Sequence, residues 1–355
     1  MDSTKSLSYM RFLAFAALGV GVALALLLIW RLAFVLVMAY AAILAAILLH
    51  VASEPLQRWT PLPRWVDLII AALVTLALVG LAGWLFGSRI SSEFSQVADR
   101  VQAGLAELQK LMSASQTGQF VLARLKSADI SVTGIFGALV STMIGAAEAA
   151  VVILISAAYL AGQPELYCAG VVLLFPASSQ DWANETLRDL GVALRYWLIG
   201  QLLQMAIVGL LSTLAVWGIG LPSPWALGLI AALAEFIPYL GPILAAIPAL
   251  LVALTQDPHA VIWTLGAYLL IHQVEGNLVV PLVQRRMIYI PPALMLLGIA
   301  AIGALLGPIG FVIAAPVVVA VFVVVKKVYV RETLKQPVVL PGESERDARA
   351  SGLAA

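Results

Sequence analysis

Long apolar runs, each broken by only a few polar residues, follow one another along most of the chain. An α-helix needs roughly 20 apolar residues to cross about 30 Å of hydrocarbon. Runs close to that length occupy residues 12–30, 32–49, 66–87, 135–161, 197–219 and 260–280. The pattern therefore predicts an all-α, polytopic membrane protein with about six full spans.

Two further apolar stretches are broken by proline and glycine, and we expect each to form a helical hairpin. Residues 225–256 carry a single charge, Glu235. As one straight helix they would extend about 48 Å, well beyond the bilayer core. Residues 293–307 and 309–325 form the second candidate. The expected hinge residues, where the backbone hydrogen-bond ladder is interrupted, are Pro238, Gly241, Pro242, Gly307 and Gly310.

The remaining segments are more polar and divide the chain. Residues 88–130 have apolar positions at steps of three and four, which is typical of an amphipathic helix that packs on a neighbouring subunit or lies on the membrane surface. Residues 162–195 have the composition of an interfacial amphipathic pair. The expected parts are three spans in 1–87, an extramembrane amphipathic segment in 88–132, spans with both hairpins in 133–336, and a disordered tail in 337–355.

Composition supports the membrane assignment and excludes several other classes. Of 355 residues 62% are hydrophobic and 11% are charged, against roughly 25% charged in soluble domains. The net charge of +1 gives no signal for nucleic acid. The lone Cys168 and three scattered histidines offer no disulfide framework or metal-ligand spacing. Because nucleotide-binding and catalytic motifs are also lacking in the sequence, we expect no enzyme activity, no cofactor and no metal site.

The basic residues predict an orientation. Short loops rich in Lys and Arg face the cytoplasm. Five basic clusters, including Arg285-Arg286 and the cluster at 326–335, fall on that side if both hairpins return to the side from which they came. Both termini are then cytoplasmic, and residues 88–130 lie on the opposite side.

Ionisable residues within apolar runs are costly in a bilayer and are therefore candidates for function. Glu235 precedes the first proline of the first break, where its carboxylate could bind a cation or polar solute, or could hydrogen-bond and lock the hairpin. Glu148 lies beside a stripe of small residues and could carry a proton or bond a neighbouring helix. The other transport-pathway candidates are Glu275, Asn277, Gln201 and Gln204.

Each of these polar residues also has a structural interpretation. Gln201 and Gln204 share a helix face and could bind solute or join helices. Glu275 and Asn277 belong to a polar patch before Pro281 that could simply cap the span at the membrane surface. We assign His272 in that patch to packing, and Arg285-Arg286 to cytoplasmic anchoring.

Three C-terminal runs resemble the autoinducer-2 exporter family of bacterial membrane proteins. They are LAEFIPYLGPILAAIPALLVAL at 233–254, EGNLVVPLVQRR at 275–286 and ALLGPIGFVIAAPVVVAV at 304–321. The segment MIYIPPALML after Arg286 departs from the family, which more often has a Leu-His-Pro pattern there.

The resemblance implies a multi-pass protein of the bacterial inner membrane that exports a small polar solute. It also implies a homo-oligomer, with a pentamer as the candidate assembly. Sodium or lithium exchange for protons is an alternative within the family, and a membrane scaffold that transports nothing is an alternative outside it. The sequence alone does not name the solute or a coupling ion.

Overall fold

The computed structural model describes residues 31–54, 57, 64–115, 117–120, 151–281 and 290–334, and no strand occurs among them. A helix at Arg31–Glu54 comes first, and a second unlabelled helix, Val151–Gly162, meets α5 at an angle of 85°. The labelled elements are α2 (Arg64–Ser113), α5 (Pro164–Val172), α6 (Gln180–Ile219), α7 (Pro224–Ala234), α8 (Gly241–Leu254), α9 (Pro258–Val274), α11 (Pro292–Leu306) and α12 (Pro308–Val325), with π-helical turns at Glu275–Val279 and Lys326–Thr333. The predicted all-α class is confirmed over this part of the chain.

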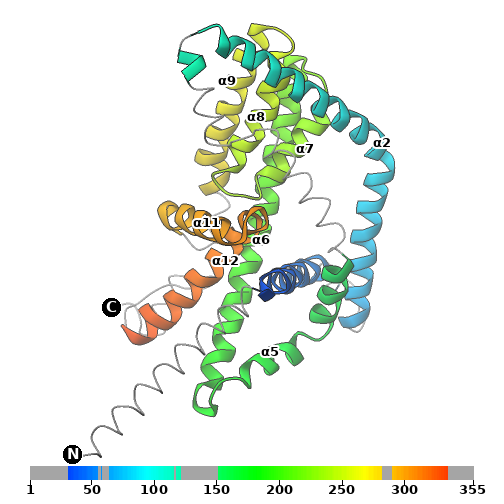
Figure 1. Ribbon diagram of the computed structural model, residues 1–355. Coiled ribbons are helices and arrows are strands. Elements are labelled where there is room, and N and C mark those ends of the chain that lie inside the picture. The colour runs from blue at the N-terminus through cyan, green and yellow to red at the C-terminus, as the bar shows by residue number, and fades with distance from the viewer. Residues whose placement is uncertain are drawn as a thin grey trace, which may run out of the picture.

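Helix α6 runs through the middle of the fold (Figure 1). Two hydrophobic cores form along it. The first core joins the C-terminal half of α6 to α7, α8, α9 and the second half of α2. The second core joins the N-terminal half of α6 to the helix Arg31–Glu54, α11 and α12. The two cores meet where α7 ends, because Phe236 and Ile237 already belong to the second one.

The first hairpin has the predicted form. Helices α7 and α8 lie against each other and are separated by residues 235–240. Pro238 cannot continue the helical ladder, and Tyr239 adopts a positive φ of 65°. Gly241 is required at the tip, because a Cβ atom there would lie 2.6 Å from the carbonyl oxygen of Ala234. Two short helices that meet between Ile237 and Pro242 are therefore confirmed.

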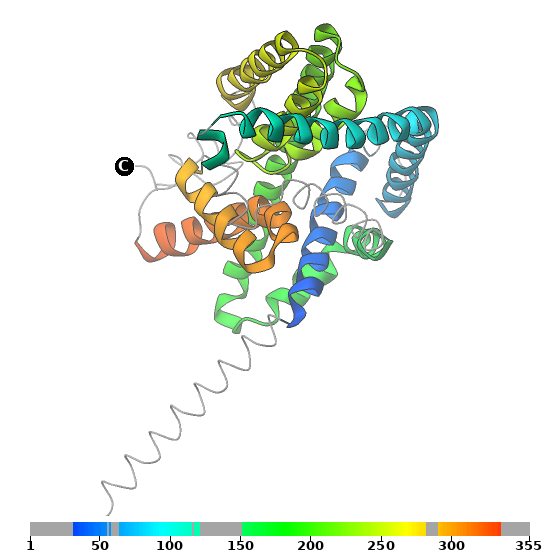
Figure 2. The same cartoon turned by 45° about the horizontal axis from the view of Figure 1, so that its top comes forward.

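Helix α2 corrects two sequence predictions. Residues 66–87 and the start of 88–130 were expected as a span and a separate amphipathic segment, but one helix runs from Arg64 to Ser113. Its apolar face was expected on another subunit or on the membrane surface. Instead Val97 and Val101 enter the first core of the same chain. The second half of α2 thus lies across α7 and α8 (Figure 2).

The two sides of the first hairpin are held by α2 at different points. The carboxylate of Glu93 accepts a hydrogen bond of 3.0 Å from the main-chain N–H of Ala226, at the start of α7. Gly104 lies against the main chain of Leu251, near the end of α8. Because α7 begins and α8 ends under the same helix, the hairpin enters and leaves at the same face of the bundle.

The second hairpin has arms of unequal length. Helices α11 and α12 pack closely at their junction, where a Cβ on Gly310 would overlap the carbonyl of Ile302. The expected segments 293–307 and 309–325 correspond to α11 and α12. Helix α12 continues into the following π-helical turns, and Pro308–Arg331 is 24 residues long and apolar enough to cross a membrane. The second arm is therefore the longer one.

The count of six full spans is not confirmed. By length and composition three described helices could cross a membrane, Arg31–Glu54, Ala177–Ile219 and Pro308–Arg331, or four if the bent pair at 151–172 is one span. The predicted break between 162–195 and the span at 197–219 is wrong, because α6 is continuous from Gln180. The predictions for residues 12–30, for most of 135–161 with Glu148, for Arg285-Arg286 and for the tail lie outside the described residues.

Candidate transport site

Glu235 lies at the C-terminal end of α7 and is only 2% exposed. Its position follows from the break, because α7 cannot continue toward Pro238. The side-chain amide of Gln201, on α6, donates a hydrogen bond of 2.6 Å to the main-chain carbonyl of Glu235. This contact fixes the tip of the hairpin on the central helix and leaves the Glu235 carboxyl group to point elsewhere.

Glu275 occupies the corresponding position at the end of α9 and is 6% exposed. Its carboxylate contacts His272 Nδ1 at 2.9 Å and accepts a longer hydrogen bond of 3.4 Å from Gln204 on α6. The helix becomes π-helical over Glu275–Val279, and π-helical turns within α-helices are often found at functional sites.

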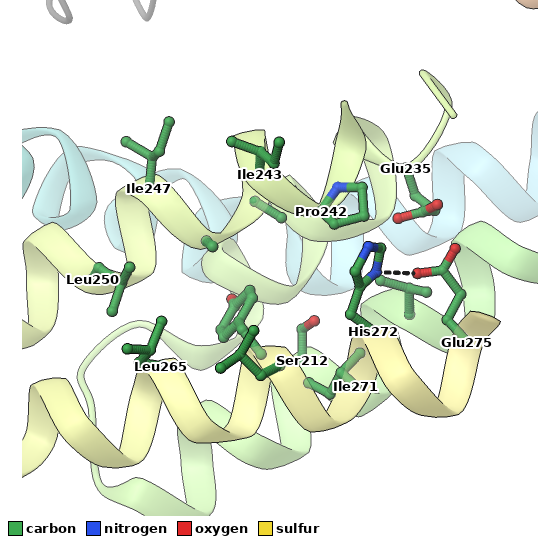
Figure 3. Close-up of a pocket in the computed structure, with 15 residues that line it drawn as sticks. Ser212, Glu235, Pro242, Ile243, Ile247, Leu250, Leu265, Ile271, His272 and Glu275 are labelled. Carbon is green, nitrogen blue, oxygen red and sulfur yellow. Dashed lines mark hydrogen bonds and ion pairs between the residues drawn. The ribbon is translucent and has the colours of Figure 1, made fainter. Parts of the chain in front are cut away.

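The carboxyl groups of Glu235 and Glu275 face each other across the space between α8 and α9 (Figure 3). They come from different helices, 40 positions apart in the sequence. A glutamine of α6 contacts each residue: Gln201 bonds the main-chain carbonyl of Glu235, and Gln204 bonds the carboxylate of Glu275. Neighbouring carboxyl groups repel each other when both are ionised. The pair therefore favours a proton or a cation between them. The structure thus joins Glu235, Glu275, Gln201 and Gln204 into one cluster.

A cavity of about 270 Å³ extends from this carboxyl pair. Glu235, His272 and Glu275 lie at one end of it, whereas Ile247, Leu250 and Leu265 line the other (Figure 3). Pro242, one of the predicted hinge residues, lies between them. Two cavity residues were not expected from the sequence, Ser212 on α6 and Tyr268 on α9. Both lie in apolar runs where nothing marks them as different from packing residues.

The site lies well inside the helical bundle. Helix α7 has 11 residues, and at 1.5 Å per residue it carries the chain about 16 Å from the face covered by α2. Broken helices with polar groups inside the bundle are typical of solute sites in membrane transporters.

The other predicted candidates do not join the cluster. Asn277 is exposed, and its amide donates to the carbonyl and side-chain oxygens of Gln273 at 2.8 and 3.1 Å. Asn277 is thus separate from Glu275, which lies in the buried cluster. Gly307 and Gly310 belong to the second hairpin and do not line the cavity. In the described part of the chain no group of three or more His, Cys, Asp or Glu side chains could hold a metal ion.

The helical hairpins and the long apolar helices are typical of a multi-pass membrane protein. Comparison with known families agrees: residues 14–331 match the family model described as AI-2E family transporter. The chain belongs to this family, as the C-terminal runs indicated.

Several relatives carry transport names. The chain is 34% identical over 158 residues to "Putative transport protein YrrI" of Bacillus subtilis, a match that covers 44% of this chain and 45% of that protein. It is 24% identical to a Thermotoga maritima protein of the same description, over 76% of this chain and 84% of that one. It is 33% identical to "AI-2 transport protein TqsA" of Escherichia coli, over 26% and 28% of the two chains. The YrrI match thus spans less than half of each protein.

Proposed function

We propose that the protein is a secondary transporter of the bacterial inner membrane that exports a small polar solute through the site at Glu235 and Glu275. The observation that carries the proposal is the pair of buried, facing carboxyl groups at the break of the first hairpin. The name of the relative TqsA makes autoinducer-2 the first solute to test.

The hairpin supplies a route by which the site could open. Its tip is in the second core through Phe236 and Ile237, while its arms are in the first. A shift of one core against the other would therefore move Glu235 relative to Glu275. Alternation between two such arrangements is how transporters with broken helices expose a central site to each side in turn.

Assembly and orientation form part of the proposal. Large apolar side chains such as Trp217, Leu270 and Leu297 are more than half exposed, which suits contact with lipid or with further copies of the chain. The assembly is a homo-oligomer, with a pentamer as the candidate. Both termini lie in the cytoplasm according to the positive-inside rule.

Flux into proteoliposomes tests this function. The purified protein is reconstituted and assayed with labelled autoinducer-2 and, in parallel, with sodium and lithium. We expect solute flux that falls at least tenfold in Glu235→Gln at equal protein content. The control is Asp99→Asn, which removes an exposed carboxyl group on α2 and should leave flux unchanged.

The same vesicles separate the alternatives. An internal pH indicator that responds to added sodium or lithium, without solute flux, would replace solute export with cation/proton exchange. Absence of flux of every solute and cation under imposed gradients would instead support a membrane scaffold.

A further inference from the structure

Three buried polar atoms line the cavity beside the carboxyl pair, and no described residue gives them a hydrogen bond of good geometry. They are Oε2 of Glu235, Oγ of Ser212 and Oη of Tyr268. Such atoms are uncommon in folded proteins, because a buried polar atom without a hydrogen bond is destabilising. The hydroxyl groups of Ser212 and Tyr268 are neighbours, and the carboxyl group of Glu235 lies next to that of Glu275. Their gathering around one cavity gives that cavity a polar end that suits a ligand able to form hydrogen bonds.

The charge of the cavity points to a cation. Of the lining residues, Glu235 and Glu275 are acidic and only His272 can be basic. The imidazole of His272 is already bound to Glu275. A positively charged group between the two carboxylates would offset the repulsion between them and supply the missing contact of Glu235.

The shape and the apolar walls point to an organic cation. Beyond the carboxyl pair, the cavity runs along the apolar side chains of Ile247, Leu250 and Leu265 (Figure 3). A proton or an alkali ion would use only the polar end. The cavity volume of about 270 Å³ is close to the lower end of the range of roughly 300–1,000 Å³ that is usual for small-molecule sites.

The cavity also has a side open to the exterior. Ile243 on α8 and Leu269 on α9 both line it, and each is 59% exposed. These residues are on helices whose outer faces are apolar, so the opening faces the region that lipid would occupy. A cation with an apolar body can reach the site by that path.

We propose that this site binds a small organic cation, with an ammonium-like head between Glu235 and Glu275 and an apolar body along α8 and α9. The proposal rests on the proposed transport through the site and names its substrate class. The same arrangement makes Ser212 and Tyr268 available for hydrogen bonds to a ligand that also carries a hydroxyl group.

Binding to the full chain in lipid nanodiscs tests the proposal. The probe is radiolabelled phenyltrimethylammonium, and its neutral isostere tert-butylbenzene and sodium ions serve as competitors. We expect saturable binding of the probe, and neither competitor should displace it at a tenfold higher concentration. Displacement by tert-butylbenzene would identify a non-selective apolar groove, displacement by sodium would identify an alkali-ion site, and either result, or a lack of saturable binding, overturns the proposal.

Variants extend the test to named residues. Glu235→Gln and Glu275→Gln should each weaken probe binding at least tenfold, as should Ala246→Phe, which fills the cavity from α8. Asp99→Asn should bind the probe as the unmodified protein does. If the two glutamate variants do not fold, the isostere comparison on the unmodified protein decides.

The binding assay and the flux assay test the two proposals separately. Flux of autoinducer-2 without binding of phenyltrimethylammonium would overturn the organic-cation class and retain the proposed function. Saturable, charge-dependent binding without flux of any solute would retain the site and overturn transport.

Discussion

The side-chain amide of Gln201 donates a hydrogen bond to the main-chain carbonyl of Glu235, at the residue where α7 ends. A helix leaves its last carbonyl groups without intrahelical donors. Gln201 is 4% exposed, so its amide replaces a donor that water does not readily supply there. The central helix thus holds the broken hairpin through the main chain, and the Glu235 carboxyl group stays available.

Replacing Gln201 by leucine should destabilise the hairpin tip. The variant leaves a buried carbonyl without a donor, which costs about 1–3 kcal/mol. We expect a lower temperature of aggregation for the purified protein and reduced flux. Gln204→Leu is the matched comparison, because it removes only a hydrogen bond of 3.4 Å and should have a smaller effect on stability. Equal losses of stability would contradict the anchoring role of Gln201.

Removing the acceptor oxygens of Glu93 should loosen the start of α7. Its carboxylate accepts from Ala226 N–H and so caps the helix from α2, since the N-cap residue Ser223 makes no such bond. Loss of a cap costs typically about 1 kcal/mol. We expect faster hydrogen exchange in the first turn of α7 for Glu93→Ala than for Glu93→Gln, which retains an acceptor oxygen. The two variants should not differ in exchange at α11, which lies in the other core.

Gly104 is expected to tolerate no side chain. A Cβ atom there would overlap the main-chain carbonyl of Leu251, whereas one on Gly191 of α6 would meet no atom within 4 Å. Overpacking costs about 1–3 kcal/mol, while an unhindered Gly→Ala change within a helix stabilises it by up to about 1 kcal/mol. Gly104→Ala should therefore lower the thermal stability in lipid nanodiscs, and Gly191→Ala should preserve or raise it. Equal behaviour of the two variants would contradict the close contact between α2 and α8.

The sequence could predict the breaks but not what lies around them. Pro238, Gly241 and Pro242 act through local backbone chemistry, so their pattern located the hairpin and the buried Glu235. The pairing of Glu235 with Glu275 depends on how α9 returns along α8. A spacing of 40 positions in the sequence gives no sign of that contact. The sequence also gives no sign that Ser212 and Tyr268 are buried beside it.

The surface that the apolar face of residues 88–113 covers could not be predicted from the sequence. Charged residues at helical spacing indicate an amphipathic helix but do not identify the surface that its apolar face covers. Here Val97 and Val101 cover the open end of α7 and α8, and Glu93 satisfies the N-terminus of α7. Similarly, Lys327 belongs to the basic cluster at 326–335, and the sequence gives no sign that its side chain is only 4% exposed.

The ion pair of Lys327 with α6 provides a final prediction. Its ammonium group lies 2.5 Å from a carboxylate oxygen of Asp189 and 3.7 Å from one of Glu185. The side chain of Asp189 is 28% exposed and that of Glu185 is 75% exposed. Removing one partner of a fully buried pair costs roughly 3–5 kcal/mol, and exposed pairs contribute about 0–1 kcal/mol. Asp189→Asn should therefore lower thermal stability clearly, and Glu185→Gln only slightly.

Exchanging the two charges checks that the ion pair itself is responsible for this stability. Lys327→Asp alone places a carboxylate beside Asp189 and Glu185, and should destabilise the protein more than Asp189→Asn does. Combining it with Asp189→Lys restores opposite charges between α6 and the end of α12, so the double variant should regain part of the lost stability. The measurement is the fraction of protein that remains monodisperse after heating. Losses that simply add in the double variant would show that the two side chains act separately.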